Sequence, residues 1–274
     1  MDFTNIIFRH GKIRNLSPRT IKSYTFCVGK FLRRFPHKQV KQISKKDVEQ
    51  YLFELSQKKR SAATINLYHN AIKFFFHVGL KKRLLVHVPS AKVEKRIPEY
   101  LNQEETKQLF SCIHNQKHLL MIKLLYSSGM RVSELVNLKV KDLENSHGWV
   151  RQGKGAKDRP FIIAKRLQKE LSIHIIENTL KPKSWLFPAR DPLKHLTVRT
   201  VQSILKIARK KAKISKTLTP HTLRHSFATH LLQNGYAITD LQPLLGHNRL
   251  DTTMIYVHMA APQILRTKSP LDEL

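Results

Sequence analysis

Apolar residues recur at helical spacing through the first third of the chain. Ser17 and Pro18 mark a helix start, because a hydroxyl can cap the first turn and proline suits its first position. The apolar positions that follow at intervals of three or four residues are Ile21, Tyr24, Val28, Phe31 and Leu32. Similar patterns begin at Ser44 and near Ser61, and a shorter segment covers 80–85. The pattern predicts a small helical domain.

The rest of the chain combines helical patterns with one strand pattern. Asn102 and Glu105 form a capping box at a helix start, and a second helix ends at Gly129. Between 148 and 163, two short apolar runs flank a segment rich in glycine and lysine, which predicts a β-hairpin. Helical patterns return over 166–178 and 197–212. We therefore expect a mainly α protein with a small β-hairpin, of the α+β class.

A linker separates these two parts. The stretch from Val88 to Pro98 contains two prolines and a run of charged residues. The sequence thus predicts a helical domain over 1–88, a linker over 89–97 and a larger domain over 98–274. Residues 1–97 have a net charge of +17 and the remainder has +14, so both parts are basic. Two basic domains on a short linker suggest a clamp around an anionic duplex.

The charge of the chain is unusual for a globular protein. Its 50 Lys and Arg oppose 19 Asp and Glu, which gives a net charge of +31. Nucleic acid fits this excess best as a partner, because phosphate binding releases counterions. We find no membrane-spanning stretch and no signal-peptide pattern, and Cys27 and Cys112 lie far apart in helical patterns. We expect a cytoplasmic protein in a reducing compartment.

The segment from Thr219 to His225 carries the first candidate chemistry. Thr219 as a cap and Pro220 in the first turn start a helix, which places His221 and Arg224 one turn apart on one face. Unpaired N–H groups at this helix end favour an anion, and arginine can hold a phosphate through two hydrogen bonds. His221 and His225 also have the spacing of two metal ligands, but no cysteine or carboxylate accompanies them. A phosphate site is the favoured interpretation.

A turn and a tyrosine follow. Gly246 ends one helix as a C-cap, and His247 lies in the turn. Asp251 starts the next helix, whose first turns contain Tyr256. A tyrosine in a helix is ordinarily a core residue, so the interest of Tyr256 depends on the residues around it.

Four segments, in this order, resemble the signature segments of the tyrosine recombinases, the phage integrase family. They are Gly-Met-Arg-Val-Ser-Glu-Leu (129–135), His-Thr-Leu-Arg-His (221–225), Leu-Leu-Gly-His (244–247) and Tyr256. The layout is most similar to that of Xer-type recombinases and related integrases. The resemblance implies that 1–88 is a SAM-like core-binding domain and 98–274 a catalytic domain.

The same resemblance implies an activity. It implies a site-specific recombinase that cuts and rejoins DNA through a 3′-phosphotyrosine intermediate and a Holliday junction. Chromosome dimer resolution and the integration or excision of mobile elements both use this chemistry. The expected partners are double-stranded DNA with paired half-sites and further copies of the chain in a homotetramer. We expect no membrane partner, and the need for an activating protein stays open.

The resemblance also implies roles for named residues. Arg131 and Arg224 would hold the non-bridging oxygens of the scissile phosphate and stabilise the charge of the transition state. Tyr256 would attack in line, and His221 would take its proton as general base. A phenol with a pKa of about 10 is mostly protonated at neutral pH and therefore requires such a base.

Three further residues belong to the implied site. Lys154, in the hairpin, would protonate the leaving oxygen, and we prefer it to Lys157 because it matches the family position. His247 would donate a hydrogen bond to a phosphate oxygen. Glu134 would position the basic groups, although an ordinary ion pair with an arginine explains it equally well.

One position departs from the family pattern. Pro243 stands where the family more often has another residue. If Thr239 caps this helix, Pro243 falls at about its fourth position and can distort its first turn. His247 would then shift slightly.

No cofactor is expected. The covalent intermediate conserves the energy of the phosphodiester, so the chemistry requires neither ATP nor a metal ion. The sequence Gly153-Lys154-Gly155 is rich in glycine but lacks the ending of a nucleotide-binding loop.

Two other classes of protein share some of these features. A type IB topoisomerase-like enzyme would use the same residues to relax supercoils as a monomer. A non-catalytic DNA-binding regulator would need only the basic surfaces, and the six reactive residues argue against it. The helical first domain favours a recombinase. So does the tail after Tyr256, which resembles the segment that family members pass to a neighbouring protomer.

Overall fold

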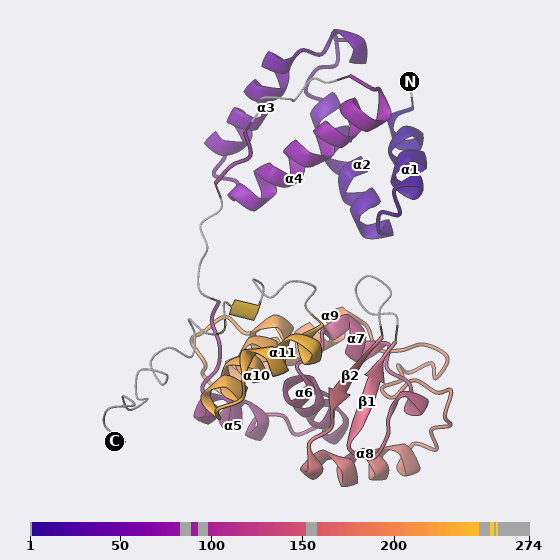
Figure 1. The fold of residues 1–274 in the computed structure, drawn as a ribbon, viewed down its shortest axis with the longest axis vertical. Helices are drawn as coiled ribbons and strands as arrows, with labels where there is room; N and C mark the ends of the chain where they lie inside the picture. The colour runs from indigo at the N-terminus through magenta and orange to yellow at the C-terminus, as the bar shows by residue number, and fades with distance from the viewer. Residues whose placement is uncertain are drawn as a thin grey trace, which may run out of the picture. The chain divides into compact units, whose positions relative to one another are not determined.

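The computed structural model divides the chain into two units, Met1–Lys95 and Arg96–Leu274 (Figure 1). The structure describes residues 2–82, 89–92, 98–151, 158–246, 253, 254 and 256. The division falls inside the segment that the sequence assigns to a linker. Among the described residues, none of the helices has the length and apolar character that crossing a membrane requires.

The N-terminal unit consists of helices packed on one another. Its elements are α1 (Phe3–Ile13), α2 (Pro18–Leu32), a 3-10 turn (Val40–Gln42), α3 (Lys45–Gln57), α4 (Ala62–Lys73) and a π-helical turn (Phe74–Gly79). Ser17, Ser44 and Ser61 cap α2, α3 and α4, because each side chain accepts the backbone N–H of the residue three positions later. These three helix starts confirm the sequence prediction.

Two parts of this unit differ from the prediction. Helix α1 has no counterpart in it, and the Asp2 carboxylate starts this helix by accepting two backbone N–H groups of the first turn. The segment 80–85 was expected to be helical, but α4 runs into the π-helical turn that ends at Gly79, and residues 80–82 are not helical. Lys81 adopts a left-handed conformation, with φ of 55°, which ends the helix. Residues 83–85 lie outside the described residues.

Aromatic side chains fill the core of the N-terminal unit. Phe31, Phe75 and Phe76 are fully buried. The ring of Phe31 meets the rings of Tyr51 and Phe76 edge-on, with centroids 5.2 and 6.3 Å apart. Such T-shaped contacts add to the stabilisation that comes from burying apolar area. Packing of apolar rings therefore holds this unit together.

The C-terminal unit combines helices with one hairpin. Its elements are α5 (Gln103–Ser111), α6 (Gln116–Ser128), α7 (Val132–Val136), a 3-10 turn (Val140–Asp142), β1 (His147–Val150), β2 (Arg159–Ile162), α8 (Lys165–Glu177), α9 (Val198–Lys211), α10 (Pro220–Gln233) and α11 (Ile238–Leu245). Asn102 and Glu105 form the predicted capping box of α5. Gly129 ends α6 with φ of 59°, a conformation that favours glycine.

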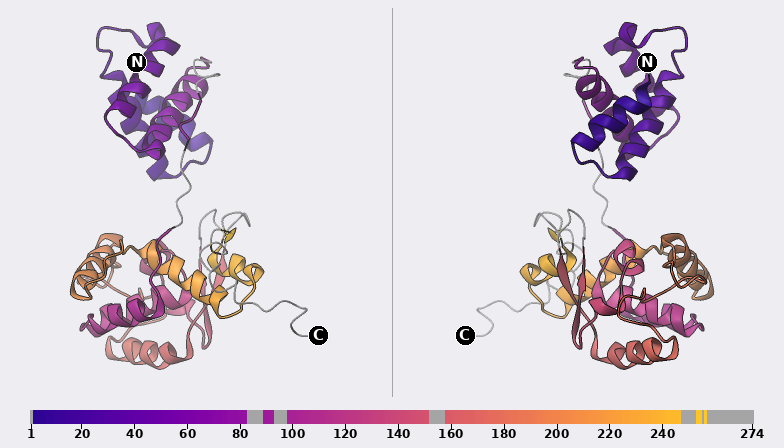
Figure 2. Two further views of the ribbon diagram at one scale, coloured as in Figure 1. Left: turned by 90° about the vertical axis from the view of Figure 1, so that its left-hand side faces the viewer. Right: turned by 90° about the vertical axis from the view of Figure 1, so that its right-hand side faces the viewer.

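Helix α6 lies at the centre of this unit. It contacts α5, α7, α8, α10 and β2 (Figure 1). Strands β1 and β2 pair antiparallel, with His147 opposite Ile162, and residues 152–157 between them lie outside the described residues. Both views of Figure 2 show the hairpin side by side with α11, which contacts β2. The predicted class, mainly α with a small hairpin, is confirmed.

Candidate active site

The N-terminal turns of α10 carry three basic side chains on one face. Thr219 caps the helix by accepting a backbone N–H of the first turn, and Pro220 occupies its first position, as the sequence predicts. His221 is exposed, Arg224 is 3% exposed and His225 is half-buried. The helix therefore carries one guanidinium group into the interior and keeps two imidazoles close to it.

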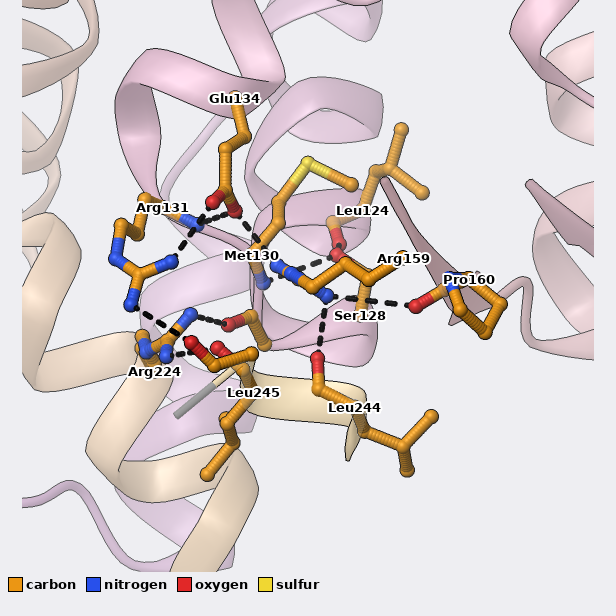
Figure 3. Close-up of polar contacts among 12 residues, drawn as sticks. Leu124, Ser128, Met130, Arg131, Glu134, Arg159, Pro160, Arg224, Leu244 and Leu245 are labelled. Carbon is orange, nitrogen blue, oxygen red and sulfur yellow. Dashed lines mark hydrogen bonds and ion pairs between the residues drawn. The ribbon is translucent and has the colours of Figure 1, made fainter. Parts of the chain in front are cut away.

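Arg224 joins the ends of two other helices. Its Nη1 donates to the Gly129 carbonyl at 2.8 Å, and its Nη2 donates to the Leu245 carbonyl at 2.5 Å (Figure 3). These carbonyls lie at the C-terminal ends of α6 and α11, where unpaired carbonyls and the helix dipole favour a cation. Burial, and then nearby Arg131, lower the pKa of Arg224 to about 10. The guanidinium group is still charged at neutral pH.

Arg131 approaches the same end of α11. Its backbone N–H and its Nη1 both donate to the Glu134 carboxylate at 2.8 Å. Its Nη2 lies 3.5 Å from the Gly246 carbonyl, next to the carbonyl that Arg224 binds (Figure 3). Two guanidinium groups thus converge on one helix end, and guanidinium is the side-chain group best suited to bind a phosphate through two hydrogen bonds.

Glu134 also binds a third arginine, Arg159 of β2. The carboxylate accepts from Arg159 Nη2 at 2.6 Å, and the two side chains are only 6% and 9% exposed. Burial alone would raise the pKa of Glu134, but Arg159 and then Arg131 hold that pKa below its ordinary value. The ionised carboxylate thus links two guanidinium groups from different elements. Glu134 therefore belongs to a buried network that joins α7 to β2, which an ordinary ion pair within one helix does not do.

Arg159 fastens α11 to the hairpin. Its Nη1 donates to the Leu244 carbonyl in the last turn of that helix. Gly246 then ends the helix with φ of 61°, as the sequence predicts. A side chain at this position would place its Cβ 2.6 Å from Arg159 Cδ. Glycine therefore suits this turn, because any other residue would strain the backbone and displace the Arg159 side chain.

The start of α11 differs from the prediction. Thr239 does not cap this helix, because it begins at Ile238 and the Asp240 carboxylate accepts the backbone N–H of Ala237 at 3.2 Å. Pro243 lies inside the helix, at its sixth position. The helix nevertheless continues to Leu245, and the carbonyls of Leu244 and Leu245 are bound by Arg159 and Arg224.

Tyr256 lies in a small apolar cluster beside these arginines. The side chain is 2% exposed and packs with Phe227, Leu241 and Leu245. Its hydroxyl oxygen is 3.2 Å from Nδ1 of His225. Burial raises the pKa of Tyr256, and the charge and hydrogen bond of Arg224 oppose this rise without cancelling it. The phenol is therefore protonated at neutral pH.

The structure brings most of the predicted residues together. Arg131, Glu134, Arg224 and Tyr256 surround the end of α11, and His221 lies on the same helix as Arg224. Lys154 and His247 lie outside the described residues. The sequence analysis does not identify Arg159 as part of the site, and it does not predict the contact between His225 and Tyr256. Arg159 has a detectable signal, because it alternates with buried Phe161 and so shares the inward face of β2.

The chain matches two family descriptions that together cover most of its length. Residues 99–262 match the phage integrase family, and residues 3–85 match the phage integrase N-terminal SAM-like domain. The chain belongs to the phage integrase family.

The integrase is similar to named tyrosine recombinases along nearly its whole length. It is 35% identical to tyrosine recombinase XerA of Pyrococcus furiosus over 268 residues, which cover 96% of this chain and 90% of the relative. It is 33% identical to tyrosine recombinase XerD of Oceanobacillus iheyensis, over 92% of this chain and 91% of the relative. These similarities confirm the predicted family and enzyme class, a site-specific tyrosine recombinase.

Solved structures show the same fold. A crystal structure of XerA recombinase aligns with a TM-score of 0.58 and 31% identity, over 98% of the integrase and 99% of that chain. A structure of XerH recombinase, described as a post-cleavage complex with a palindromic difH substrate, aligns with a TM-score of 0.75 and 26% identity, over 93% and 80%. The mainly α fold with an N-terminal helical domain is therefore that of the tyrosine recombinases.

Proposed function

We propose that the integrase cuts and rejoins double-stranded DNA at specific sites, with Tyr256 as its nucleophile. The arrangement of Tyr256 carries this proposal: its hydroxyl is buried next to Arg224, at the helix end on which Arg131 also converges. A nucleophile and two phosphate-binding groups are the components that a phosphoryl transfer through a covalent intermediate needs.

The proposed reaction uses the two arginines as a clamp. Arg131 and Arg224 bind the non-bridging oxygens of the scissile phosphate and stabilise the charge that develops on them. The phenol oxygen of Tyr256 forms a bond to phosphorus, and the bond from phosphorus to the 5′ oxygen breaks. A 3′-phosphotyrosine and a free 5′-hydroxyl result, and the reverse reaction on a second strand rejoins the DNA through a Holliday junction.

Lys154, His221 and His247 complete the proposed catalytic set. The roles that the resemblance gives them stay predictions: Lys154 as general acid, His221 as general base and His247 as hydrogen-bond donor. We expect Lys154→Ala to slow cleavage, and a substrate with sulfur at the 5′-bridging position to restore much of the rate, because a thiolate leaves without a proton. Rescue of a Lys157→Ala variant instead would show that Lys157 is the acid.

Both parts of the chain are proposed to bind the DNA backbone. Residues 1–97 and 98–274 have net charges of +17 and +14, and each can neutralise phosphates. Solved relatives are described as bound to DNA substrates, among them the XerH complex. We therefore propose that the two units form a clamp around the duplex, and that the integrase acts on DNA in the cytoplasm.

Recombination between two sites requires an assembly, for which we propose a homotetramer. Residues 263–274 lie outside the described residues and include apolar side chains, which we propose dock on a neighbouring catalytic domain. Removing these residues should leave binding to a single half-site intact, while cooperative binding to paired half-sites and recombination fall. Normal assembly by the truncated protein would rule out this coupling role.

Suicide-substrate trapping tests the proposed function. A nicked DNA that releases the short fragment carrying the new 5′-hydroxyl on cleavage should accumulate a covalent complex with the integrase. The absence of such a complex would favour a non-catalytic regulator. Recombination between two sites, measured beside plasmid relaxation, then separates a recombinase from a type IB topoisomerase-like enzyme, which relaxes supercoils and does not exchange sites.

A further inference from the structure

Arg159 is a buried arginine of the site to which the predicted roles assign nothing. It is the first residue of β2, and its side chain is 9% exposed, whereas that of Arg131 is 22% exposed. A phosphate that binds Arg131 therefore has little access to Arg159. Any effect of Arg159 on the reaction must pass through the groups that it contacts.

Three arginines bind three successive carbonyls at the C-terminal end of α11. The pairs are Arg159 with Leu244, Arg224 with Leu245 and Arg131 with Gly246 (Figure 3). Because the three arginines share this short stretch of backbone, a shift of the helix end would move the carbonyls that both proposed phosphate-binding arginines contact. Arg159 connects this helix end to β2 and so fixes the position of the shared backbone.

Arg159 and Arg131 also divide the Glu134 carboxylate between them. Its Oε1 accepts from Arg131 Nη1 at 2.8 Å, and its Oε2 accepts from Arg159 Nη2 at 2.6 Å. A carboxylate otherwise tends to bind one guanidinium group through two parallel hydrogen bonds. Because Arg159 occupies Oε2, the second terminal nitrogen of Arg131, Nη2, is directed at the Gly246 carbonyl instead. That contact is 3.5 Å, which is long for a hydrogen bond, so a phosphate oxygen can replace the carbonyl.

We propose that Arg159 is a positioning residue, which keeps a guanidinium nitrogen of Arg131 available for the scissile phosphate. It does so by occupying one oxygen of Glu134 and by fixing the end of α11 at Leu244. Without Arg159, the carboxylate would draw a second nitrogen of Arg131 and turn the guanidinium group away from the phosphate. This inference rests on the proposed function, because it takes Arg131 as one of the two groups that bind the phosphate.

The experiment measures single-turnover cleavage of suicide substrates by Arg159→Met and by Arg131→Met. Methionine keeps an unbranched side chain but has no hydrogen-bond donor. The scissile group is either an ordinary phosphate or a methylphosphonate, in which a methyl group replaces one of the two non-bridging oxygens. The two diastereomers of the methylphosphonate are tested separately. An arginine nitrogen that binds one oxygen loses its partner in the diastereomer without that oxygen, so removing the nitrogen should matter least there.

We expect Arg159→Met to slow cleavage of the phosphate substrate about 10- to 100-fold, because misplacing a binding group slightly has effects of this size. On one diastereomer the loss should fall below about 3-fold, and the loss in Arg131→Met should shrink on the same diastereomer. The inference is overturned if Arg159→Met cleaves the phosphate substrate at the normal rate. It is also overturned if the Arg159→Met loss is equal on all three substrates, or shrinks on a diastereomer that leaves the Arg131→Met loss unchanged.

Arg209→Met is the matched control for removing an arginine that binds carbonyls. Arg209 lies in the last turn of α9 and donates to the carbonyls of Ile214 and Ser215, neither of which belongs to the site. We expect this variant to cleave all three substrates at the wild-type rate. Binding to a single half-site should also be unchanged in Arg159→Met, because the proposed effect is on the reaction and not on DNA affinity.

Folding and the proposed function are tested separately. If Arg159→Met does not fold, as judged by urea unfolding, Arg159→Lys replaces it. Lysine can donate to Glu134, but its one nitrogen cannot take the places of both Nη1 and Nη2. We then expect a smaller loss with the same dependence on the diastereomer, and a uniform loss or none overturns the inference. If the wild-type protein forms no covalent complex with the phosphate substrate, the proposed function fails, whatever the Arg159 variants do.

Discussion

The two units of the integrase differ in one kind of ion pair: among the described residues, a pair with both side chains buried occurs in the C-terminal unit and not in the N-terminal unit. In the N-terminal unit, Arg34 and Glu54 pair at 2.9 Å on the surface, with side chains 54% and 22% exposed. In the C-terminal unit, the side chains of Arg159 and Glu134 are 9% and 6% exposed, and Arg224 is 3% exposed. The net charges of the two parts are nearly equal, so composition does not reveal this difference. Burial of charge, and not its amount, indicates where the chemistry lies.

Burying these arginines has a physical cost that a surface pair does not have. Removing a guanidinium group from water is unfavourable unless anions and carbonyls replace the water. Glu134 and the carbonyls of Gly129, Leu244 and Leu245 provide that replacement. The result is a site whose positive groups are held in place before DNA arrives, which is how fixed charges stabilise a transition state.

The largest expected effect comes from replacing the planar guanidinium group of a buried arginine with the ammonium group of lysine, which has the same charge. Arg224→Lys should slow single-turnover cleavage at least about 10²-fold, because lysine cannot bind two carbonyls and a phosphate in the same geometry. The matched control in the N-terminal unit is Arg34→Lys, which should leave the cleavage rate unchanged. An Arg224→Lys protein that cleaves at the normal rate would show that the buried guanidinium group is not needed for catalysis.

The second prediction compares stability between the two units. Glu134→Gln should lower the free energy of unfolding of the C-terminal unit by about 3–5 kcal/mol, because it leaves buried guanidinium groups without their anion. Glu54→Gln should lower that of the N-terminal unit by less than about 1 kcal/mol. Both tryptophans, Trp149 and Trp185, lie in the C-terminal unit, so fluorescence during urea unfolding reports that unit and circular dichroism reports both. Equal losses of unfolding free energy in Glu134→Gln and Glu54→Gln would show that the buried ion pair is no more important for stability than the surface pair.

The third prediction concerns acid. The pKa of Glu134 is lower in the folded protein than its ordinary value, so its ionisation stabilises the fold at pH values above that ordinary value. This contribution is lost as the pH falls through the lowered pKa. The stability difference between wild type and Glu134→Gln should therefore be constant near neutral pH and shrink below about pH 4. Urea unfolding at a series of pH values measures it, and a difference that grows in acid would contradict the lowered pKa.

The smallest expected effect is that of removing metal ions. If Arg131 and Arg224 supply the positive charge at the phosphate, strand cleavage should proceed at an unchanged rate in EDTA and without nucleotide. The assay is single-turnover cleavage with and without magnesium. A strict need for magnesium in the cleavage step would mean that the buried arginines are not sufficient.

Local chemistry explains why much of the fold could be predicted. Ser17, Ser44 and Thr219 cap their helices through residues three positions away, and Gly129 and Gly246 end theirs through their own conformation. These signals lie within a few neighbouring residues, so they are visible in the sequence. Helix α1 is not predicted, because Asp2 caps it without the proline or the second capping residue that marks the starts of α2 and α3.

The contacts of the site could not be predicted in the same way, because they join distant segments. Arg159 meets Glu134 across 25 positions, and His225 meets Tyr256 across 31. The motifs identified Arg131, Arg224 and Tyr256 as candidates by resemblance. Which histidine contacts the phenol depends on where Tyr256 lies relative to α10, and the spacing of His221 and His225 does not determine it.

The covalent complex tests the central claim most directly. After suicide-substrate cleavage, the trapped protein is digested and the peptide that carries the nucleotide is located by mass spectrometry, with Tyr256→Phe as the matched control. We predict a nucleotide linked to Tyr256, and for Tyr256→Phe nearly normal DNA affinity without any covalent complex, because only one hydroxyl is lost. A covalent complex formed by the Tyr256→Phe protein, or a nucleotide on another residue, would contradict the assignment of Tyr256 as the nucleophile.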